Sequence, residues 1–435
     1  MLSCFGGSAA ALPTVGTYAI IVFNIMVKKG DQVLGPKRAY IDLYVLAPYV
    51  VLSLFSIIMV YSASGDYIHM QFDLSTTAYM WRQMAFVLVG FALCTVTFML
   101  RIGVLRRPWF LGGGMVITIA LLMYLLVKGR VNPSTAINGA SSWIPVGPIN
   151  IQPSEIGKLL IVLYLAHMLT RREVNLNPRS LIDSARVLRA PLGMVVVILI
   201  LVFLQPDTGG AAILASIIIV MVFASGLRWQ TGLGFLTVGG LLAGGGYYLL
   251  VNKFQGLLSS HYQGRRLLAV LHPFAMQKVE GKQLVNSMYA INHGGLFGVG
   301  LGNGTIKLGY LPEPYTDFIL SVITEELGIL GGIVVVGMIF FLVWRTMLVG
   351  IRAHSTYKAL LMYGIATMLF IQTTFNVGGV LGVLPITGVT LPFVSYGGSS
   401  FMILSVAIGI VLNVSATERR DRAAGIGADG RLDVK

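Results

Sequence analysis

Long apolar runs separated by short polar segments dominate this chain of 435 residues. A helix needs about 20 mostly apolar residues to cross the hydrocarbon core of a bilayer. Runs that reach or approach this length lie at 42–62, 80–99, 109–127, 155–170, 188–205, 209–225, 231–252, 317–344, 357–377 and 394–414. The pattern predicts an all-α integral membrane protein with about ten transmembrane helices and a large extracellular loop between spans seven and eight.

Composition supports a membrane protein. Hydrophobic residues make up 56% of the chain and charged residues 11%, and the mean hydropathy is +0.81. A soluble domain carries about 25% charged residues, so the charge here is too sparse to cover a water-exposed surface. The chain has a net charge of +14, and its basic residues lie mainly in short loops between apolar runs. This is the pattern of membrane loops and argues against nucleic acid as a partner. Cys4 and Cys94 have neither disulfide-framework nor metal-ligand spacing.

The distribution of basic residues predicts the orientation. Arginines follow the even-numbered spans, whereas the loops at 63–79 and 378–393 contain neither lysine nor arginine. By the positive-inside rule both termini are cytoplasmic. We therefore divide the chain into an N-terminal extension that the span pattern leaves unassigned, a membrane domain with an outer loop, and a cytoplasmic tail. Their bounds are 1–39, 40–415 (outer loop 253–316) and 416–435.

Ionisable residues near the hydrocarbon are costly and rare, so each is a candidate for function. Glu155 and Lys158 open the fourth span three residues apart, on one helical face. They either form a structural ion pair or line a polar cavity. Asp207 lies between spans five and six, where it either caps the next helix or takes part in a site.

The eighth span is expected to begin at about Asp317. From there Asp317, Ser321, Thr324 and Gly328 fall on one helical face, which predicts a polar stripe descending from the outer surface. At 1.5 Å per residue Glu325 would lie about 12 Å deeper than Asp317. On spacing alone, Asp317 is either a helix cap or a functional acid.

The outer loop combines basic residues with glycines. Its candidate phosphate ligands are Arg265, Arg266, Lys282 and Lys307. A glycine-rich chain can bring backbone amides and cations close to a phosphate, although a solvated loop near anionic lipid headgroups would look the same.

Small residues open the last span. Ser395, Gly397 and Gly398 either allow close helix packing or leave room for a substrate headgroup. Together the candidate clusters describe a polar cavity in a membrane, which fits a transferase acting on a lipid-linked substrate or a transporter.

Four segments resemble the signature segments of the SEDS (shape, elongation, division and sporulation) family, in the same order. They are 152–158, 205–209, 310–318 and 392–400, and the similarity extends over about 40–415. Residues 300–303 and 385–388 are closer to the division-type branch than to the elongation-type branch. The chain departs from the usual motifs at Tyr315, His272 and 304–306, which leaves any role of a histidine at 315 or an acid at 272 in doubt.

The resemblance implies a glycosyltransferase that polymerises lipid II, an undecaprenyl-pyrophosphate disaccharide pentapeptide, outside the bacterial cytoplasmic membrane at the division septum. It also implies a class B penicillin-binding protein transpeptidase and the division machinery as partners. The family's essential aspartate, in the Thr316-Asp317 motif, would be the general base. Arg266 and Lys307 would stabilise the leaving pyrophosphate, and a divalent cation, Mg or Mn, would share this role.

Two alternatives from other classes compete with the polymerase. A lipid II flippase would more often show an internal repeat with broken helices, and we see none. A non-catalytic division scaffold would tolerate Asp317→Asn.

Overall fold

The computed structural model describes most of the chain. The described residues are 36–72, 75–131, 142–146, 149–172, 181–226, 262–277 and 281–424, with single residues at 233, 237, 241 and 245. Asp42–Val414 form one compact unit. A second unit holds the two ends of the chain, in which the short helix η1 (Lys37–Tyr40) is described. All contacts reported below lie within the first unit.

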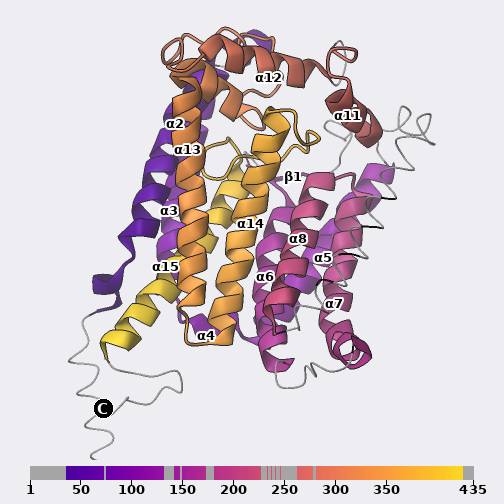
Figure 1. Cartoon of the computed structure of the whole chain (residues 1–435), viewed down its shortest axis with the longest axis vertical. Coiled ribbons are helices and arrows are strands. Elements are labelled where there is room, and N and C mark those ends of the chain that lie inside the picture. The colour runs from indigo at the N-terminus through magenta and orange to yellow at the C-terminus, as the bar shows by residue number, and fades with distance from the viewer. Residues whose placement is uncertain are drawn as a thin grey trace, which may run out of the picture. The chain divides into compact units, whose positions relative to one another are not determined.

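Helices make up almost all of the regular structure (Figure 1). They are α2 (Leu43–Phe72), α3 (Ala78–Met99), α4 (Ile102–Leu105), α5 (Pro108–Val131), α6 (Pro153–Arg172), α7 (Leu181–Leu204), α8 (Thr208–Ala224), α11 (Tyr262–Leu271), α12 (Gly281–Gly294), α13 (Ile319–Ile351), α14 (Thr356–Val380) and α15 (Gly398–Ala423). Strands β1 (Ile144–Val146) and β2 (Ile149–Ile151) pair antiparallel, with Ile144 opposite Ile151.

Nine of the ten predicted spans overlap helices in the described part of the chain. Six helices there are long and apolar enough to cross a membrane: α2 over Leu43–Gly65, α3, α5, α13, α14 and α15. Shorter apolar stretches lie in α7 and α8. The seventh predicted span, 231–252, lies outside the described residues except for four single positions within it, 233, 237, 241 and 245. The total of ten spans therefore stays a prediction.

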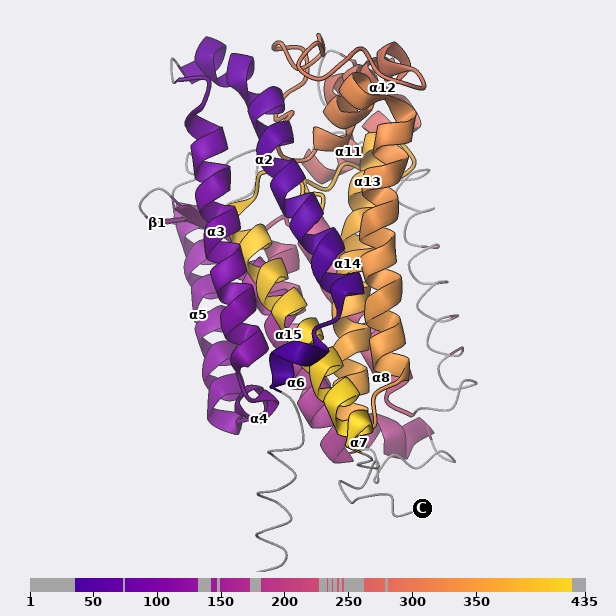
Figure 2. The same cartoon turned by 90° about the vertical axis from the view of Figure 1, so that its left-hand side faces the viewer.

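Helices α5, α6, α7 and α8 pack against one another, and α14 contacts α6 and α8 as well as α13. Helix α13 also packs against α2, which pairs with α3. Both views show α11 and α12 at the end of the bundle where α2 ends and α3 begins (Figure 2). The predicted outer loop, 253–316, thus contains two helices in its described part.

Buried polar groups join these helices. Asp42, fully buried before α2, accepts two hydrogen bonds from Arg345 of α13, at 3.0 and 2.7 Å. The Tyr49 hydroxyl of α2 donates to Ser405 of α15 at 2.8 Å, and Asn413 of α15 donates to the carbonyl of Thr97 in α3 at 2.8 Å. Because a buried polar group without a partner is costly, these pairs fix how the helices meet.

Helix α13 differs from the prediction in its start and its continuity. It begins at Ile319 rather than at Asp317, and Gly328 interrupts it with φ 76° and ψ 174°. The polar stripe expected from Asp317 to Gly328 is therefore not one continuous helical face. The prediction was wrong because it assumed an unbroken helix.

The interruption in α13 is stabilised by the loop that follows α12. The carbonyls of Glu325 and Glu326 accept hydrogen bonds from the backbone amides of Val299 and Gly300, each at 3.0 Å. A Cβ at Gly328 would collide with the carbonyl oxygen of Leu296. The positive φ and this close approach both require glycine.

Candidate functional site

Asp317 lies on the partly buried turn that leads into α13. Its backbone carbonyl accepts a hydrogen bond at 2.8 Å from the side-chain amide of Asn376 in α14, which donates also to the carbonyl of Val389 at 2.8 Å. Asn376 therefore holds the Asp317 turn against the segment between α14 and α15. Phe318, not Asp317, is the residue that precedes the helix, and Asp317 is not its cap.

Arg266 of α11 and the Asp317 carboxylate both lie close to the backbone of Gly388. A Cβ at Gly388 would lie 3.5 Å from Asp317 Oδ2 and 3.9 Å from Arg266 Nη1. Arg266 Nη1 donates to the carbonyl of Ile386 at 3.0 Å, which anchors the guanidinium. The structure thus brings two predicted site residues, Asp317 and Arg266, to one place.

The surroundings of Asp317 raise the pKa of its carboxyl toward neutral pH. The pKa of its carboxyl is raised from 3.8 to about 6, mainly by burial and also by the charge of Glu313, while Arg266 opposes the rise. At neutral pH the group is still mostly ionised, but it binds a proton more readily than an exposed aspartate. This is the property required of a general base.

Thr316, the other predicted residue of this motif, stabilises the turn itself. Its hydroxyl donates to the Glu313 carbonyl at 3.1 Å and lies 3.3 Å from the Glu313 carboxylate. Glu313 has a positive φ of 53°. Thr316 and Glu313 therefore support the unusual backbone that presents Asp317.

Asp207 caps α8, as one of the two sequence interpretations predicted. Its Oδ1 accepts from the backbone amide of Gly210 at 2.7 Å. Its Oδ2 accepts from Gln152 and Ser154, each at 3.1 Å. Burial raises the pKa of Asp207, and the Gly210 amide opposes that shift.

The predicted ion pair between Glu155 and Lys158 is confirmed, at 2.8 Å and largely buried. Lys158 also donates to Gln372 of α14 at 3.3 Å, and Gln372 donates to the carbonyl of Thr390 at 3.1 Å. A polar chain therefore connects α6 with the segment that packs beside Asp317. Glu155 Oε2 is buried and has no hydrogen-bond partner among the described residues.

The small residues before and at the start of α15 are used in packing. The Ser395 hydroxyl accepts from the backbone amide of Leu391 at 2.8 Å. A Cβ at Gly398 would lie 2.6 Å from the ring of Phe86, and one at Gly397 would lie 3.2 Å from the side chain of Thr390. These contacts favour the close-packing interpretation.

Lys307 makes its contacts in a second cluster, away from those of Asp317. Its ammonium group lies 2.7 Å from Glu326 Oε1, 2.9 Å from the Ser62 hydroxyl and 2.9 Å from the carbonyl of Gly302. These contacts use all three donors of an ammonium group. If Lys307 bound a phosphate as predicted, its ammonium group would have to lose one of these three hydrogen bonds.

Glu325 anchors the loop next to Lys307. Its Oε1 accepts from the backbone amide of Thr305 at 2.8 Å and lies 2.9 Å from Nδ1 of His293. Sequence analysis did not assign a role to Glu325 or Glu326. Their signal was two adjacent acids inside an apolar run.

The two remaining predicted cations, Arg265 and Lys282, lie in the short helices α11 and α12. Arg265 precedes Arg266 in α11, and Lys282 is exposed at the start of α12. Among the described residues no group of three or more His, Cys, Asp or Glu side chains could hold a metal ion. A divalent cation shared with substrate phosphates stays a prediction.

Sequence analysis also missed an aromatic cluster beside Asp317. Tyr79 of α3 stacks on Tyr396 with ring centroids 4.8 Å apart, and its centroid lies 5.0 Å from that of Tyr315. The backbone amide of Tyr396 donates to the carbonyl of Tyr315 at 2.8 Å. Burial raises the pKa of Tyr315, and Glu313 raises it further, so this phenol stays protonated near neutral pH.

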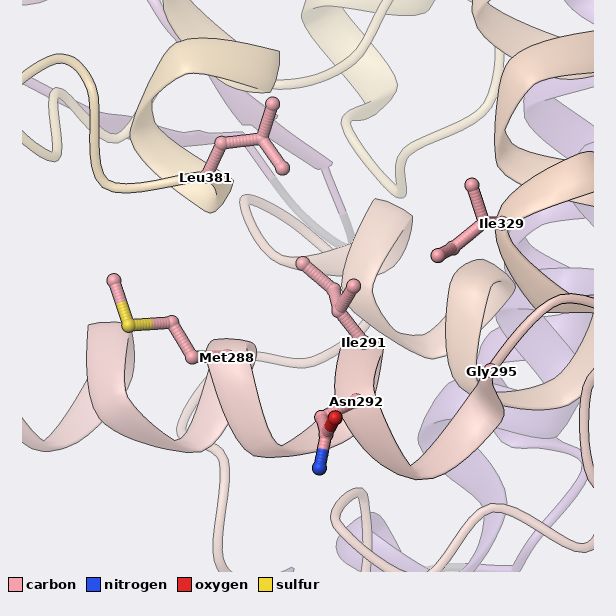
Figure 3. Close-up of a pocket in the computed structure, with 6 residues that line it drawn as sticks. All are labelled: Met288, Ile291, Asn292, Gly295, Ile329 and Leu381. Atoms are coloured by element: carbon pink, nitrogen blue, oxygen red, sulfur yellow. The ribbon is translucent and has the colours of Figure 1, made fainter.

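A pocket of about 330 Å³ opens between α12, α13 and the end of α14 (Figure 3). Met288, Ile291, Asn292, Gly295, Ile329 and Leu381 line it. None of these side chains titrates, so the pocket offers no acid or base. The candidate active site is the Asp317 turn rather than this pocket.

The helices and the acid-bearing turn define a multi-pass membrane protein of mostly helical fold with a polar site at one end. Residues 43–420 match the family of FtsW, RodA and SpoVE, which is described as cell cycle protein. The chain therefore belongs to this family, which is the SEDS family.

Relatives match the chain over most of their length. A protein of Lactococcus lactis subsp. lactis (strain IL1403) named probable peptidoglycan glycosyltransferase FtsW is 36% identical, covering 88% of this chain and 94% of its own. Stage V sporulation protein E of Bacillus subtilis (strain 168) is 34% identical, covering 88% and 99%.

Solved structures agree with this assignment. One, titled "Structural coordination of polymerization and crosslinking by a peptidoglycan synthase complex", has a TM-score of 0.69 and 27% identity, covering 87% of this chain and 98% of that one. The rod shape determining protein RodA of Thermus thermophilus has a TM-score of 0.59 and 27% identity, covering 88% and 97%.

Proposed function

We propose that this protein is a peptidoglycan glycosyltransferase that joins lipid II units into glycan strands, with Asp317 as the general base. Relatives named peptidoglycan glycosyltransferase cover most of the chain and support the activity. The observation that carries the role of Asp317 is its carboxylate, with a pKa raised to about 6, lying near the Arg266 guanidinium.

The reaction requires one bond to form and one to break. The 4-hydroxyl oxygen of one sugar attacks the anomeric carbon of another, and the bond from that carbon to the pyrophosphate oxygen breaks. The hydroxyl proton passes to Asp317, and the lipid pyrophosphate leaves with the bonding electrons. A single displacement of this kind inverts the anomeric centre.

The negative charge that develops on the leaving pyrophosphate needs a nearby cation. Arg266 supplies it, because its contact with Ile386 fixes the guanidinium beside Asp317. A Mg or Mn ion bound at this site would supply further positive charge beside that of Arg266. Glu155 and Lys158 act indirectly in this proposal, by holding Gln372 against the segment that packs beside the Asp317 turn.

The cellular setting is also part of the proposal. Relatives named FtsW favour a role in division over the elongation role of RodA. We place the site on the outer face of the cytoplasmic membrane at the septum, with both termini cytoplasmic, as the basic loops predict. The solved synthase complex supports a class B penicillin-binding protein as partner.

Glycan synthesis from labelled lipid II tests the function. Purified wild type and Asp317→Asn are compared with and without the class B partner, and thermal unfolding checks that both are folded. Asp421→Asn, which changes an acid near the end of α15, serves as the matched control. We expect polymer from the wild type and the control only.

The other outcomes are equally informative. Polymer from Asp317→Asn would show that another group is the base. If the wild type made no polymer even with the partner present, the flippase and scaffold alternatives would replace the polymerase.

A further inference from the structure

A cationic cluster lies at the end of the bundle opposite α12, the end that the basic loops predict to be cytoplasmic (Figures 1 and 2). Arg106 directly follows α4, and Arg171 lies in the last turn of α6. The charges of both arginines act on His167 of α6, so both guanidinium groups lie close to this side chain. Neither arginine forms a salt bridge with a carboxylate in the described part of the chain. Converging cations repel one another, and an anion bound between them would relieve this repulsion.

Tyr357 of α14 fixes the position of Arg106. The Cζ atom of Arg106 lies 4.5 Å from the centroid of the Tyr357 ring. A cation over an aromatic face is attracted by the ring, so Arg106 is oriented before any ligand arrives. Helix α14 also packs directly against α6, which carries His167 and Arg171. The four residues from three helical segments, called the His167 cluster below, are Arg106, His167, Arg171 and Tyr357.

Two buried polar atoms of the His167 cluster have no hydrogen-bond partner among the described residues. They are Nδ1 of His167 and the hydroxyl of Tyr357, whose side chains belong to residues that are 8% and 1% exposed. Both can donate a hydrogen bond, the imidazole through the tautomer that carries its proton on Nδ1. Buried polar groups are nearly always hydrogen-bonded in proteins, so a ligand with several acceptor oxygens suits this place.

The membrane level of the cluster is indicated by Trp109. This residue follows Arg106 by three positions, lies at the start of α5 and is 67% exposed. Exposed tryptophans of membrane proteins gather at the level of the lipid headgroups. Arg171 is also exposed, so the cluster is open to the surface at the height where lipid phosphates lie.

We propose that the His167 cluster is a binding site for a phosphate group, and that its ligand is the headgroup of an anionic phospholipid in the cytoplasmic leaflet. Basic pockets between transmembrane helices on the cytoplasmic side suit such headgroups. The inference goes beyond the proposed function, because binding at this end of the bundle requires neither lipid II nor Asp317. A bound lipid would tie the loop before α5 to α6 and α14.

Arginine suits this ligand better than lysine does. Its planar guanidinium can give two parallel hydrogen bonds to phosphate oxygens while one face rests on a tyrosine ring, as Arg106 rests on Tyr357. Free phosphate in the cytoplasm presents the same chemistry, so the test must separate the two sources.

The test measures binding of single lipids to the purified protein in neutral detergent by native mass spectrometry. Phosphatidylglycerol, phosphatidylcholine and inorganic phosphate are the probes. The variants are Arg171→Gln, which changes an exposed residue, and Arg171→Gln combined with Arg106→Gln. The matched control is Arg101→Gln, which removes an exposed arginine just before α4. Thermal unfolding checks that each variant is folded.

We expect wild type to bind phosphatidylglycerol more tightly than phosphatidylcholine. Each arginine of the cluster contributes about fivefold, so the double variant should bind phosphatidylglycerol about 25-fold more weakly, and Arg101→Gln should stay within about twofold of wild type. Inorganic phosphate should not displace the lipid.

Tyr357→Phe is the second test, because it removes one hydroxyl and leaves every charge in place. We expect it to weaken phosphatidylglycerol binding about fivefold, as loss of a hydrogen bond to a charged group does. Equal losses in Arg171→Gln and Arg101→Gln, or no loss in Tyr357→Phe, would show a general attraction of surface charge and overturn the inference. Displacement of the lipid by inorganic phosphate would overturn the assignment of a lipid and make free phosphate the ligand. Glycan synthesis enters none of these readouts, so failure of the polymerase proposal would leave them unchanged.

Discussion

The ion pair between Lys307 and Glu326 allows a quantitative prediction. The two side chains are 3% and 0% exposed and 2.7 Å apart. Lys307→Met keeps the length of the side chain and removes its charge, which leaves the Glu326 carboxylate buried with only Ser62 as a described hydrogen-bond donor. Removing one partner of a buried pair costs about 3–5 kcal/mol, because the remaining charge is uncompensated.

A double-mutant cycle separates this cost from lost packing. The cycle uses Lys307→Met, Glu326→Gln and the double variant, unfolded reversibly in mixed micelles. We expect Lys307→Met alone to lose about 3 kcal/mol, and the double variant to be less destabilised than the sum of the single changes by about 2 kcal/mol. Lys282→Met, an exposed lysine of the same segment, is the stability control and should stay within about 0.5 kcal/mol of wild type.

The reasoning would be refuted by either of two results. A loss below about 1 kcal/mol for Lys307→Met would mean that Glu326 is not held as a buried charge. Strictly additive losses would mean that the two side chains do not act as a pair.

Three further predictions follow from Asp317 and Gly328. With the pKa of Asp317 raised to about 6, kcat is expected to fall about tenfold per pH unit below pH 6 and to level off above pH 7, and a flat profile from pH 5 to 7 would contradict this. Because the folded state disfavours the Asp317 carboxylate, Asp317→Asn should raise the free energy of unfolding by about 2 kcal/mol at pH 7.5 but not near pH 4; an equal gain at both values would exclude this cause. Gly328→Ala should lower the yield of folded protein sharply, whereas Gly337→Ala, in open space on the same helix, should not; equal yields would show that the positive φ at Gly328 is dispensable.

Sequence alone predicted the features that depend on local spacing. The apolar runs gave the helices, the three-residue spacing gave the pair of Glu155 and Lys158, and the position before an apolar run gave the cap at Asp207. The interruption of α13 could not be predicted, because it depends on backbone hydrogen bonds to residues 295–300.

The paired backbone of residues 295–300 and the interrupted turn at Gly328 make two separate stretches of sequence depend on each other. Each stretch supplies the hydrogen-bond partners that the other lacks, so neither can keep its conformation alone. We expect chimaeras between family members to tolerate exchange of these stretches together and to fail when only one is exchanged. In evolution, substitutions at the two places should then be inherited as correlated pairs.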